Sequence, residues 1–314
     1  MKTLLIFNPR SGRSGRNARL WPIVQAFVGA RSADSKIVRT EGPGHATTLA
    51  REAIEAGTTR VIAVGGDGTM NEVAQALINT PASLGLVPCG SGNGLALHLG
   101  LPLSPLEALA LATGNTGRVA LVDTGTVNGR PFFNAMGVGL DADVSRRFNR
   151  LTTRGLPAYA RTAASAFMSA KTERCVITSG AERIEVDSLL IAVANSDQYG
   201  NRALIAPGAR VDDGELDVII VGRVGLLGAC ALGLRLFSGT FDKSAHVRRL
   251  RGARFTIERS GPGLIHTDGE THEGGSIVQI EVHHRCLKIV VPSGCRAVAT
   301  SFDRAPSGFA LQLP

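Results

Sequence analysis

The sequence contains few cysteines, no closely spaced pair of them and no long apolar segment. Its five cysteines are scattered, which indicates buried or incidental thiols in a reducing compartment and excludes a CxxC motif. The first apolar run ends at Asn8, too early for a signal peptide. The longest later run, 224–237, contains Arg235 and is shorter than the roughly 20 residues that a bilayer span needs. We therefore expect a cytoplasmic protein that would contact a membrane only peripherally, at its inner face.

Acidic residues are in deficit as well. The 26 Asp and Glu residues are outnumbered by 34 Lys and Arg residues, which gives a net charge of +8. A basic surface favours nucleic acid, an anionic membrane or a phosphorylated ligand, and charge alone does not choose among them. With 44% hydrophobic and 19% charged residues the chain is not globally disordered, and 314 residues are enough for two domains.

The first part of the chain, to about residue 125, alternates strand and helix signals. Strands are expected at 3–7, 36–39, 60–64 and 84–87, and helices at about 20–28, 45–56, 71–78 and 105–112. This alternation predicts a parallel sheet with helices on its faces.

Near Gly117 the pattern changes to mostly extended segments. Asn128-Gly129, between the apolar runs 119–127 and 131–136, is a strong signal for a two-residue hairpin. A helix is expected at about 158–170, and further strands at 175–178, 189–194, 216–221, 255–258, 277–282 and 287–291. The predicted fold class is α/β, in which a parallel sheet flanked by helices is followed by a β-sandwich or barrel-like domain.

The most informative segment is a glycine-rich turn between a buried strand and a helix. The strand 61–64 ends at Gly65-Gly66-Asp67-Gly68-Thr69, and an amphipathic helix follows at once. Glycines let a polyphosphate approach the backbone closely, and the helix N-terminus offers free N–H groups and a positive dipole end. Asp67 would repel phosphate unless a cation lay between them, which indicates Mg²⁺ held directly or through water. The alternative is a strand–helix turn without a ligand.

Two further glycine-rich loops follow predicted strands. Asn8 to Gly15 follows the strand 3–7, and Gly90 to Gly94 follows the strand 84–87. Because ligands bind at the carboxyl ends of the strands in open α/β sheets, we expect the three loops to converge on one crevice. Neither a Walker A pattern nor a GxGxxG fingerprint occurs in them, which excludes a P-loop enzyme and a standard dinucleotide dehydrogenase.

These segments resemble the signatures of a known family, in the right order. They are Asn8-Pro9, the GGDGT core with Asn71-Glu72, the GSGN loop at 90–93 and Asp268-Gly269-Glu270. The chain is similar to bacterial diacylglycerol and other lipid kinases, which are related to sphingosine kinases and more distantly to NAD kinases and phosphofructokinases. The resemblance spans nearly the whole chain and implies an ATP-dependent kinase that phosphorylates a lipid hydroxyl.

The resemblance also implies the domain organisation and the nucleotide contacts. A nucleotide-binding α/β domain over 1–125, to which residues of about 296–314 would return, precedes a β-rich lipid-substrate domain over 126–295, and ATP lies in the cleft between them. The residues that the resemblance assigns to ATP are Asn8, Pro9, Arg10, Ser11, Gly12, Thr40, Gly66, Asp67, Gly68, Thr69, Met70, Asn71, Glu72 and Ser91.

Phosphoryl transfer needs positioning, charge neutralisation and a group that accepts the hydroxyl proton. A glycine between two carboxylates permits a tight turn that aims one of them at the nucleophile. By resemblance, Glu270 is the general base and Asp268 its acidic neighbour, while Asp67 and Asp123 belong to a magnesium–water network. Without the upstream loops, Asp268-Gly269-Glu270 would be an ordinary surface turn.

A second, structural magnesium site is implied by the segment 210–215. It resembles the family's site, with Asp213 as the side-chain ligand and the carbonyl groups of Arg210 and Glu215 as further ligands. The cofactors expected from the resemblance are therefore ATP and Mg²⁺.

One position departs from the family's pattern. Most diacylglycerol kinases of this family have Asp where this chain has Gly94, so a carboxylate is missing from the expected magnesium–water network. The segment 137–143 resembles one in sphingosine kinases whose acid faces the lipid head group, which places Asp143 at the substrate. The alternative for Asp143 is an acid at a hairpin edge without a ligand. The lipid's identity stays open.

The basic residues form two clusters that could meet an anionic bilayer, although a solvated surface is the alternative. The clusters are Arg146, Arg147, Arg150 and Arg154, and Arg248, Arg249, Arg251 and Arg254. The histidines, among them His266, are spaced unlike metal ligands and are expected to be structural or exposed. The expected partner is the lipid substrate; no nucleic acid is expected, and a homodimer stays open.

Two other functions remain as alternatives. An NAD kinase-like small-molecule kinase shares GGDGT but has a different C-terminal half, and the first loop together with Asp268-Gly269-Glu270 favours the lipid kinase. A non-catalytic basic protein that binds membrane or nucleic acid would not need intact phosphate loops, and here they are intact.

Overall fold

Four short aliphatic strands form a parallel sheet in the N-terminal lobe of the computed structural model, which describes residues 2–12, 16–30, 34–114, 116–151 and 155–299. The sheet order is β2-β1-β3-β4, and its strands are β1 (Thr3–Phe7), β2 (Ser35–Arg39), β3 (Arg60–Gly65) and β4 (Ser83–Pro88). β1, β3 and β4 are buried along their whole length because helices cover both faces of the sheet.

The side chains of these strands alternate between two hydrophobic clusters. Leu5 and Phe7 pack with α1 (Arg16–Gly29) and α5 (Pro105–Thr113) on one face. Leu4 and Ile6 pack on the other face with the helices α2 (His45–Glu55), α3 (Asp67–Leu77) and α4 (Gly94–His98). This arrangement brings the loops at the carboxyl ends of β1, β3 and β4 to one edge of the sheet.

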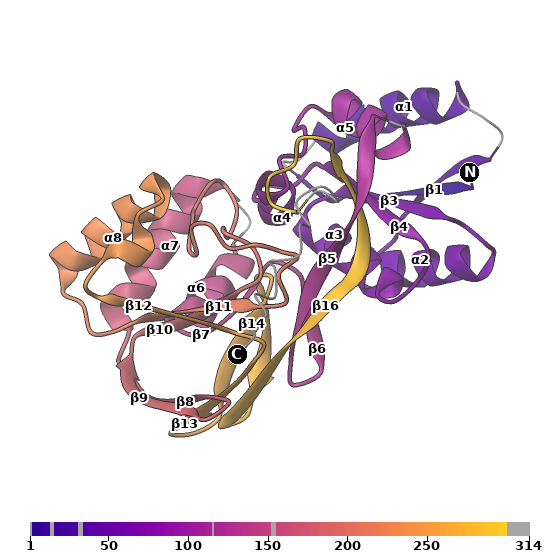
Figure 1. Cartoon of the computed structure of the whole chain (residues 1–314). Helices are drawn as coiled ribbons and strands as arrows, with labels where there is room; N and C mark the ends of the chain where they lie inside the picture. Colours follow the sequence, from indigo (N-terminus) through magenta and orange to yellow (C-terminus); the bar gives the residue numbers. More distant parts are fainter. Residues whose placement is uncertain (1, 13–15, 31–33, 115, 152–154, 300–314) are drawn as a thin grey trace, which may run out of the picture.

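A six-stranded antiparallel sheet forms the core of the second lobe. Its order is β12-β11-β10-β7-β14-β15, and its strands are β7 (Ala135–Gly139), β10 (Leu190–Ala194), β11 (Leu216–Val221), β12 (Val247–Gly252), β14 (Gly263–Thr267) and β15 (Glu270–Gly274). Figure 1 shows helices on its outer side, namely α6 (Leu140–Asn149), α7 (Leu156–Ser169) and α8 (Leu226–Ser238), and the short 3-10 helix η1 (Phe241–Lys243) follows α8.

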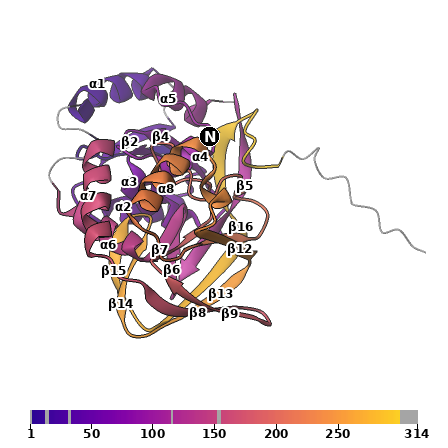
Figure 2. The same cartoon turned by 90° about the vertical axis from the view of Figure 1, so that its left-hand side faces the viewer.

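The first sheet continues into this lobe through one long strand, β16 (Ile277–Pro292), which runs beside β5 in both views (Figures 1 and 2). β16 pairs in parallel with β4 at Ile289 and Leu84, and antiparallel with its other neighbours. The remaining strands of this sheet are β5 (Gly117–Val127), β6 (Arg130–Phe132), β8 (Glu173–Ser179), β9 (Glu182–Ser188) and β13 (Arg254–Arg259).

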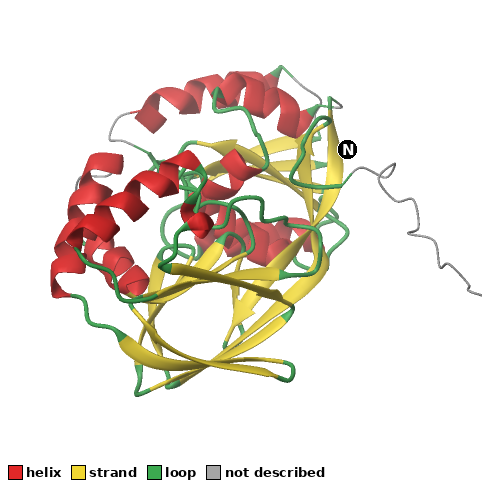
Figure 3. Cartoon of the chain, turned by 60° about the vertical axis from the view of Figure 1, so that its left-hand side comes forward, coloured by secondary structure: helices red, strands yellow, loops and turns green. Residues whose placement is uncertain are grey.

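The two sheets pack face to face in the second lobe and form the predicted β-sandwich. Met136 and Val138 of the six-stranded sheet meet Phe255 and Ile280 of the other sheet in one buried cluster. Figure 3 shows the strands as the inner layers and the helices outside them. The predicted α/β class with a parallel sheet followed by a β-sandwich is therefore confirmed.

Two local predictions were wrong. The expected strand 131–136 is divided into β6 and β7, because the carboxylate of Asp268 accepts the backbone N–H groups of Phe133, Asn134 and Ala135. The two strands expected at 277–282 and 287–291 are one strand, β16, with an irregularity between His283 and Leu287. Asp143 lies in helix α6, so the hairpin edge given as its alternative position does not apply.

The C-terminal residues predicted to return to the first domain are described only as far as residue 299. Val298 belongs to the cluster that contains Leu4 and Val61, and its carbonyl accepts a hydrogen bond from Arg118 at 2.7 Å. Residues 300–314 lie outside the described residues. The domain boundaries at 125 and 295 stay predictions, since β5 and β16 contribute to both lobes.

Candidate active site

The three glycine-rich loops meet at the carboxyl edge of the parallel sheet. A Cβ atom on Gly90 would lie 2.7 Å from the Cα atom of Gly66, so these two loops touch backbone to backbone and neither tolerates a side chain there. Asn8 donates a hydrogen bond from Nδ2 to Oγ1 of Thr69 at 2.8 Å, which joins the first loop to the second. The observed convergence is the one expected from the order of strands and loops.

Asp67 holds the GSGN loop against the start of α3. Its carboxylate accepts the backbone N–H groups of Asn93 at 2.8 Å and Gly94 at 2.9 Å. Burial raises the pKa of Asp67 although these N–H groups oppose the change. The first task of this carboxylate in the fold is therefore to fix the geometry of two phosphate loops.

Steric contacts explain why this chain has Gly94 where the family has Asp. A Cβ atom at this position would lie 2.6 Å from Nδ2 of Asn134 and 3.0 Å from the carbonyl oxygen of Tyr199. Asn134 is buried and donates from Nδ2 to the carbonyl oxygen of Gln198 at 2.8 Å. The volume that an aspartate side chain would need here is thus filled by Asn134, which lies in the segment between β6 and β7.

Glu270 brings a carboxylate from the second lobe to the start of α3. A Cβ atom built on Gly68 would lie 3.9 Å from Oε1 of Glu270, so little separates the two lobes here. Glu270 is open to solvent on one side, yet burial and then the charge of Glu72 raise its pKa. A raised pKa makes a carboxylate a stronger base.

Glu72 faces the same region from α3. Its two oxygens accept the backbone N–H groups of Gly44 at 2.9 Å and Ala46 at 3.0 Å, which connects α3 to the start of α2. Among the described residues, neither Glu72 nor Glu270 forms an ion pair with a basic side chain. The repulsion between these two like charges is therefore not offset by an ion pair with either of them.

Asp268 is held in a cage of backbone N–H groups. Its carboxylate accepts from Phe133 at 2.8 Å, Asn134 at 2.8 Å and Ala135 at 2.9 Å. Burial outweighs these three bonds and raises its pKa to about 6. Asp268 and Gly269 both adopt a left-handed conformation (φ 50° and 86°), which makes the tight turn that projects Glu270 toward the start of α3. This geometry fits a positioning role for Asp268 better than that of a base.

A buried polar group beneath this turn was missed at the sequence level. Nδ1 of His266 accepts the backbone N–H of Gly269 at 3.3 Å, and Nε2 of His266 lies 2.9 Å from Oδ2 of Asp141. The same carboxylate oxygen accepts the hydroxyl of Tyr199 at 2.6 Å. The expectation that His266 is structural agrees with this burial, but no spacing in the sequence signals the contact with Asp141.

The segment that carries Tyr199 also touches the GSGN loop. The backbone N–H of Asn201 donates to the carbonyl oxygen of Gly92 at 3.0 Å, and a Cβ on Gly200 would lie 3.0 Å from the carbonyl carbon of Gly92. Tyr199 thus connects a phosphate loop of one lobe to the Asp268-Gly269-Glu270 turn of the other.

The remaining predicted ATP contacts differ in accessibility. Thr40 lies beside the first loop, where its backbone N–H donates to the carbonyl oxygen of Phe7 at 2.9 Å, and Ser91 is exposed at the tip of the third loop. Met70 belongs to the hydrophobic core, so only its backbone is available to a nucleotide. The exposed or partly exposed members of the first loop are Asn8, Pro9, Arg10, Ser11 and Gly12.

Asp123 does not share hydrogen-bond partners with Asp67. Its carboxylate accepts the backbone N–H groups of Gly214 and Arg285, each at 2.7 Å, and lies 2.8 Å from Nδ1 of His284. Burial raises its pKa, although these contacts oppose the change. Asp123 therefore braces the segment 210–215 against β16, and none of these contacts involves the phosphate loops.

The acidic side chains of the predicted structural magnesium site form ion pairs with arginines. Asp213 pairs with Arg251, which also lies 3.0 Å from a carboxylate oxygen of Glu215, and the side chain of Arg210 pairs with Asp212 at 3.0 Å. In the part of the chain that the structure describes, no cluster of three or more His, Cys, Asp or Glu side chains is arranged to hold a metal ion. The metal roles of Arg210, Asp213 and Glu215 stay predictions.

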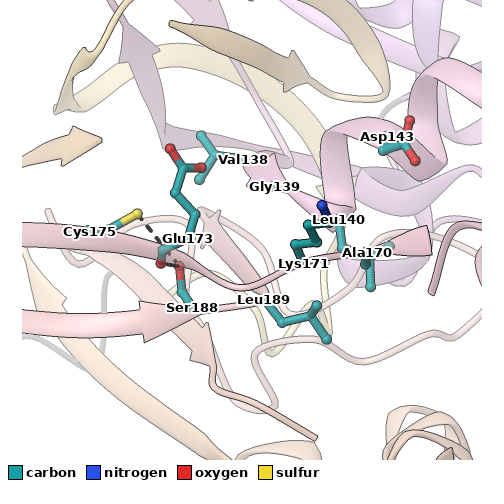
Figure 4. A pocket seen from close by; sticks show the side chains of 10 residues that line it. All are labelled: Val138, Gly139, Leu140, Asp143, Ala170, Lys171, Glu173, Cys175, Ser188 and Leu189. Atoms are coloured by element: carbon teal, nitrogen blue, oxygen red, sulfur yellow. Dashed lines mark hydrogen bonds between the residues drawn. The ribbon is translucent and has the colours of Figure 1, made fainter. Parts of the chain in front are cut away.

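Asp143 sits in the first turn of α6 and pairs with Arg146 at 2.6 Å and Arg147 at 2.7 Å. Burial alone would raise its pKa, but the hydrogen bonds and charges of these arginines outweigh burial and lower it. Asp143 also borders a cavity of about 180 Å³, whose other lining residues include Val138, Leu140 and Lys171 (Figure 4).

Most members of the two basic clusters form ion pairs within the fold, and their contact with a bilayer stays a prediction. Arg146 and Arg147 pair with Asp143, and the members of the second cluster pair with carboxylates on neighbouring strands or on η1. Of the first cluster Arg150 is exposed, and Arg154 lies outside the described residues. These clusters are therefore largely neutralised within the fold.

Glycine-rich loops at the edge of a parallel sheet, faced by a carboxylate from a β-sandwich, define a phosphotransferase that uses ATP. Residues 2–129 match the family model described as the diacylglycerol kinase catalytic domain. Residues 134–291 match the one described as the YegS C-terminal NAD kinase beta sandwich-like domain.

Individual relatives agree with these matches. A probable lipid kinase YegS-like protein of Pseudomonas aeruginosa strain PAO1 is 33% identical over 261 residues, which cover 80% of this chain and 82% of the relative. The diacylglycerol kinase of Bacillus subtilis is 28% identical over 295 residues, which cover 92% and 95% of the two chains. A crystal structure of a putative diacylglycerol kinase from Bacillus anthracis superposes with a TM-score of 0.76 at 27% identity, covering 92% of this chain and 95% of that one.

The chain belongs to the family of diacylglycerol kinases and YegS-like lipid kinases. It is an ATP-dependent lipid kinase, a phosphotransferase with an alcohol group as acceptor, and it acts on a lipid substrate. The first function predicted from the sequence is thereby confirmed over its two alternatives.

Proposed function

We propose that Glu270 is the general base of this lipid kinase and that the three glycine-rich loops hold the triphosphate of ATP. The observation that carries the proposal is the position of Glu270, which comes from the β-sandwich yet lies across from Gly68 at the start of α3. A lipid hydroxyl between the two lobes has Glu270 on one side and the γ-phosphate on the other.

In the proposed reaction the hydroxyl oxygen attacks the γ-phosphorus as Glu270 accepts the hydroxyl proton. The bond from the γ-phosphorus to the bridging oxygen breaks, and ADP leaves with that electron pair. The free N–H groups at the start of α3 and in the loops at Asn8, Gly66 and Ser91 stabilise the phosphate charge. The raised pKa of Glu270 supports its part, since a stronger base takes the proton more readily.

Asp268 acts in this proposal by holding the backbone from Phe133 to Ala135 and the turn that carries Glu270. Asp67 acts by holding the GSGN loop in the form that receives the phosphates. Both residues are therefore placed as positioning residues. Their loss would displace the reacting groups, and displacement of about 1 Å can cost 10²-fold in rate.

We also propose that Mg²⁺ enters with ATP. Magnesium in kinases is held by one or two carboxylates together with phosphate oxygens, and the like charges of Glu72 and Glu270 fit a cation in this region. Glu72 would contact the ion directly and Asp67 through water, while Asp123 supports the segment 210–215 instead. When bound, the ion supplies neutralising charge to the phosphates.

For the lipid we propose diacylglycerol or a related lipid with a free hydroxyl, as the names of the relatives suggest, with Asp143 near the polar head group. The cavity beside Asp143 supports this placement. Such an enzyme works at the cytoplasmic face of a membrane as a peripheral protein. A homodimer stays a prediction.

The test is transfer of radiolabelled phosphate from ATP to a panel of lipids dispersed in detergent, with diacylglycerol, sphingosine and monoacylglycerol as acceptors. We expect labelled phospholipid from one member of the panel, with a requirement for Mg²⁺. Labelling of NAD in place of every lipid would refute the proposal. Mg²⁺ with a non-hydrolysable ATP analogue should also raise the melting temperature more than either alone.

A further inference from the structure

Helix α8 presents most of its apolar side chains to solvent. Of its 13 residues only Leu232 is fully buried, whereas Leu227 is 88% exposed and Leu234 is 76% exposed. Leu226 and Phe237 are exposed as well. Surface helices normally turn a polar face outward, so α8 reverses the usual pattern. We call Leu226, Leu227, Leu234 and Phe237 the apolar face of α8.

A second exposed apolar residue lies on the same side of the molecule. Met168, near the end of α7, is 74% exposed. Figure 1 shows α7 and α8 together on the outer side of the six-stranded sheet, away from the β-sandwich interior. No helix in the described part of the chain is long and apolar enough to cross a membrane.

The chain segments that contain these two helices carry basic residues and no acidic ones. Between Asp143 and Glu173 the sequence has six basic residues and no acidic residue, and between Asp217 and Asp242 it has two arginines and again no acidic residue. These two segments contain α7 and α8. Arg161 on α7 and Arg223, just before α8, are exposed. Exposed apolar side chains together with the exposed Arg161 and Arg223 fit a surface that is apolar inside and negatively charged outside.

We propose that the apolar face of α8, with the basic residues beside it, docks the enzyme on an anionic lipid bilayer. The proposal rests on the lipid kinase function, because a lipid substrate lies in such a bilayer. The leucines enter the boundary between head groups and acyl chains, and Arg161 and Arg223 meet the phosphate head groups. Ala170 and Lys171, directly after α7, line the cavity beside Asp143, so docking through α7 and α8 would bring the bilayer close to that cavity.

The experiment is co-sedimentation of the full chain with vesicles of phosphatidylcholine, with or without about a third of phosphatidylglycerol. The variant Leu227→Glu/Leu234→Glu should bind vesicles at least tenfold more weakly than the wild type. The variant Arg161→Glu/Arg223→Glu should lose binding only to the anionic vesicles. Leu106→Glu serves as the matched control, because Leu106 is 54% exposed on α5 in the other lobe.

Turnover on a detergent-dispersed lipid separates this proposal from the proposed function. The α8 variant should retain wild-type turnover there and lose it only on vesicles. If the wild type phosphorylates no lipid but still binds anionic vesicles, the kinase assignment fails and the docking surface stands. Wild-type vesicle binding by the α8 variant overturns the docking surface. A further outcome also overturns it: the wild type sediments as a dimer, the α8 variant sediments as a monomer, and both bind vesicles equally. The apolar face of α8 would then contact a second copy of the chain.

Discussion

Glu270 differs from the other acids of its strand in what surrounds it. Glu270→Gln keeps the size of the side chain but cannot take up a proton, so kcat should fall by about 10²–10⁴. The affinity for ATP should change little, because the loops hold the nucleotide. Steady-state kinetics with varied ATP separate the two effects. Glu273→Gln, an exposed position on the same strand, is the control and should behave as wild type. Loss of ATP binding with normal turnover at saturating ATP would make Glu270 a nucleotide or metal contact.

Asp268 should give the stability of the protein a particular dependence on pH. Its pKa is about 6 in the folded protein and near 3.8 when exposed. Between these values the unfolded chain releases the proton while the folded chain keeps it, so the stabilising contribution present below pH 3.8 is lost as the pH rises through 6. Urea unfolding of wild type and Asp268→Asn from pH 4 to 7 measures this. The stability advantage of the wild type should shrink over that range, and a constant difference would contradict the assignment.

At the scale of elements, the loop before α4 and the segment between β6 and β7 fit together as one unit. Gly94→Asp restores the family's residue but places a Cβ 2.6 Å from Nδ2 of Asn134. Such overpacking costs about 1–3 kcal/mol, and the third phosphate loop should shift. We expect a lower melting temperature and a raised KM for ATP. Asn134→Ala in the same chain should recover part of both losses, and failure to recover any would mean that Tyr199 or the backbone sets the limit.

Tyr199 joins two elements that the sequence keeps far apart. Tyr199→Phe removes the bond to Asp141 and loosens the link between the GSGN loop and the turn that carries Glu270. We expect kcat to fall about tenfold or more with an intact fold, because small displacements of reacting groups cost rate. Tyr159→Phe is the matched control, since Tyr159 packs edge-to-face on Phe148 at 5.4 Å. Equal kinetics of the two variants would reduce Tyr199 to a packing residue.

At the scale of the molecule, β16 should make the two lobes unfold together. Leu287 of this strand is fully buried in the N-terminal cluster, while Ile280 is buried in the sandwich cluster. Leu287→Ala should cost about 2–5 kcal/mol. Calorimetry of wild type and variant should each show one transition, shifted as a whole. Two separated transitions in the variant would show that the lobes are independent.

Much of this molecule follows from the sequence alone. Periodicity and glycine placement predicted β1, β3, β4 and the loops after them, because parallel strands carry a strong apolar signal and phosphate loops need glycine. The resemblance pointed to Glu270, and the geometry that projects it depends on two left-handed residues. The contacts of Asp268 with residues 133–135 and of His266 with Asp141 could not be predicted, since they join residues more than a hundred positions apart. The ion pairs of Arg249 and Arg254 depend on which strands become neighbours, whereas those of Arg146 and Arg147 with Asp143 follow from helical spacing once α6 is known.

The contact between Gly94 and Asn134 has a consequence for the history of the chain. The glycine codons GGU and GGC become aspartate codons by a single base change, so a short mutational step joins the two residues. While Asn134 is present, the change of Gly94 to Asp destabilises the protein. The change becomes tolerable only after Asn134 has been replaced. The order of the two changes is therefore constrained, and relatives with Asp at this position should carry a smaller residue where this chain has Asn134.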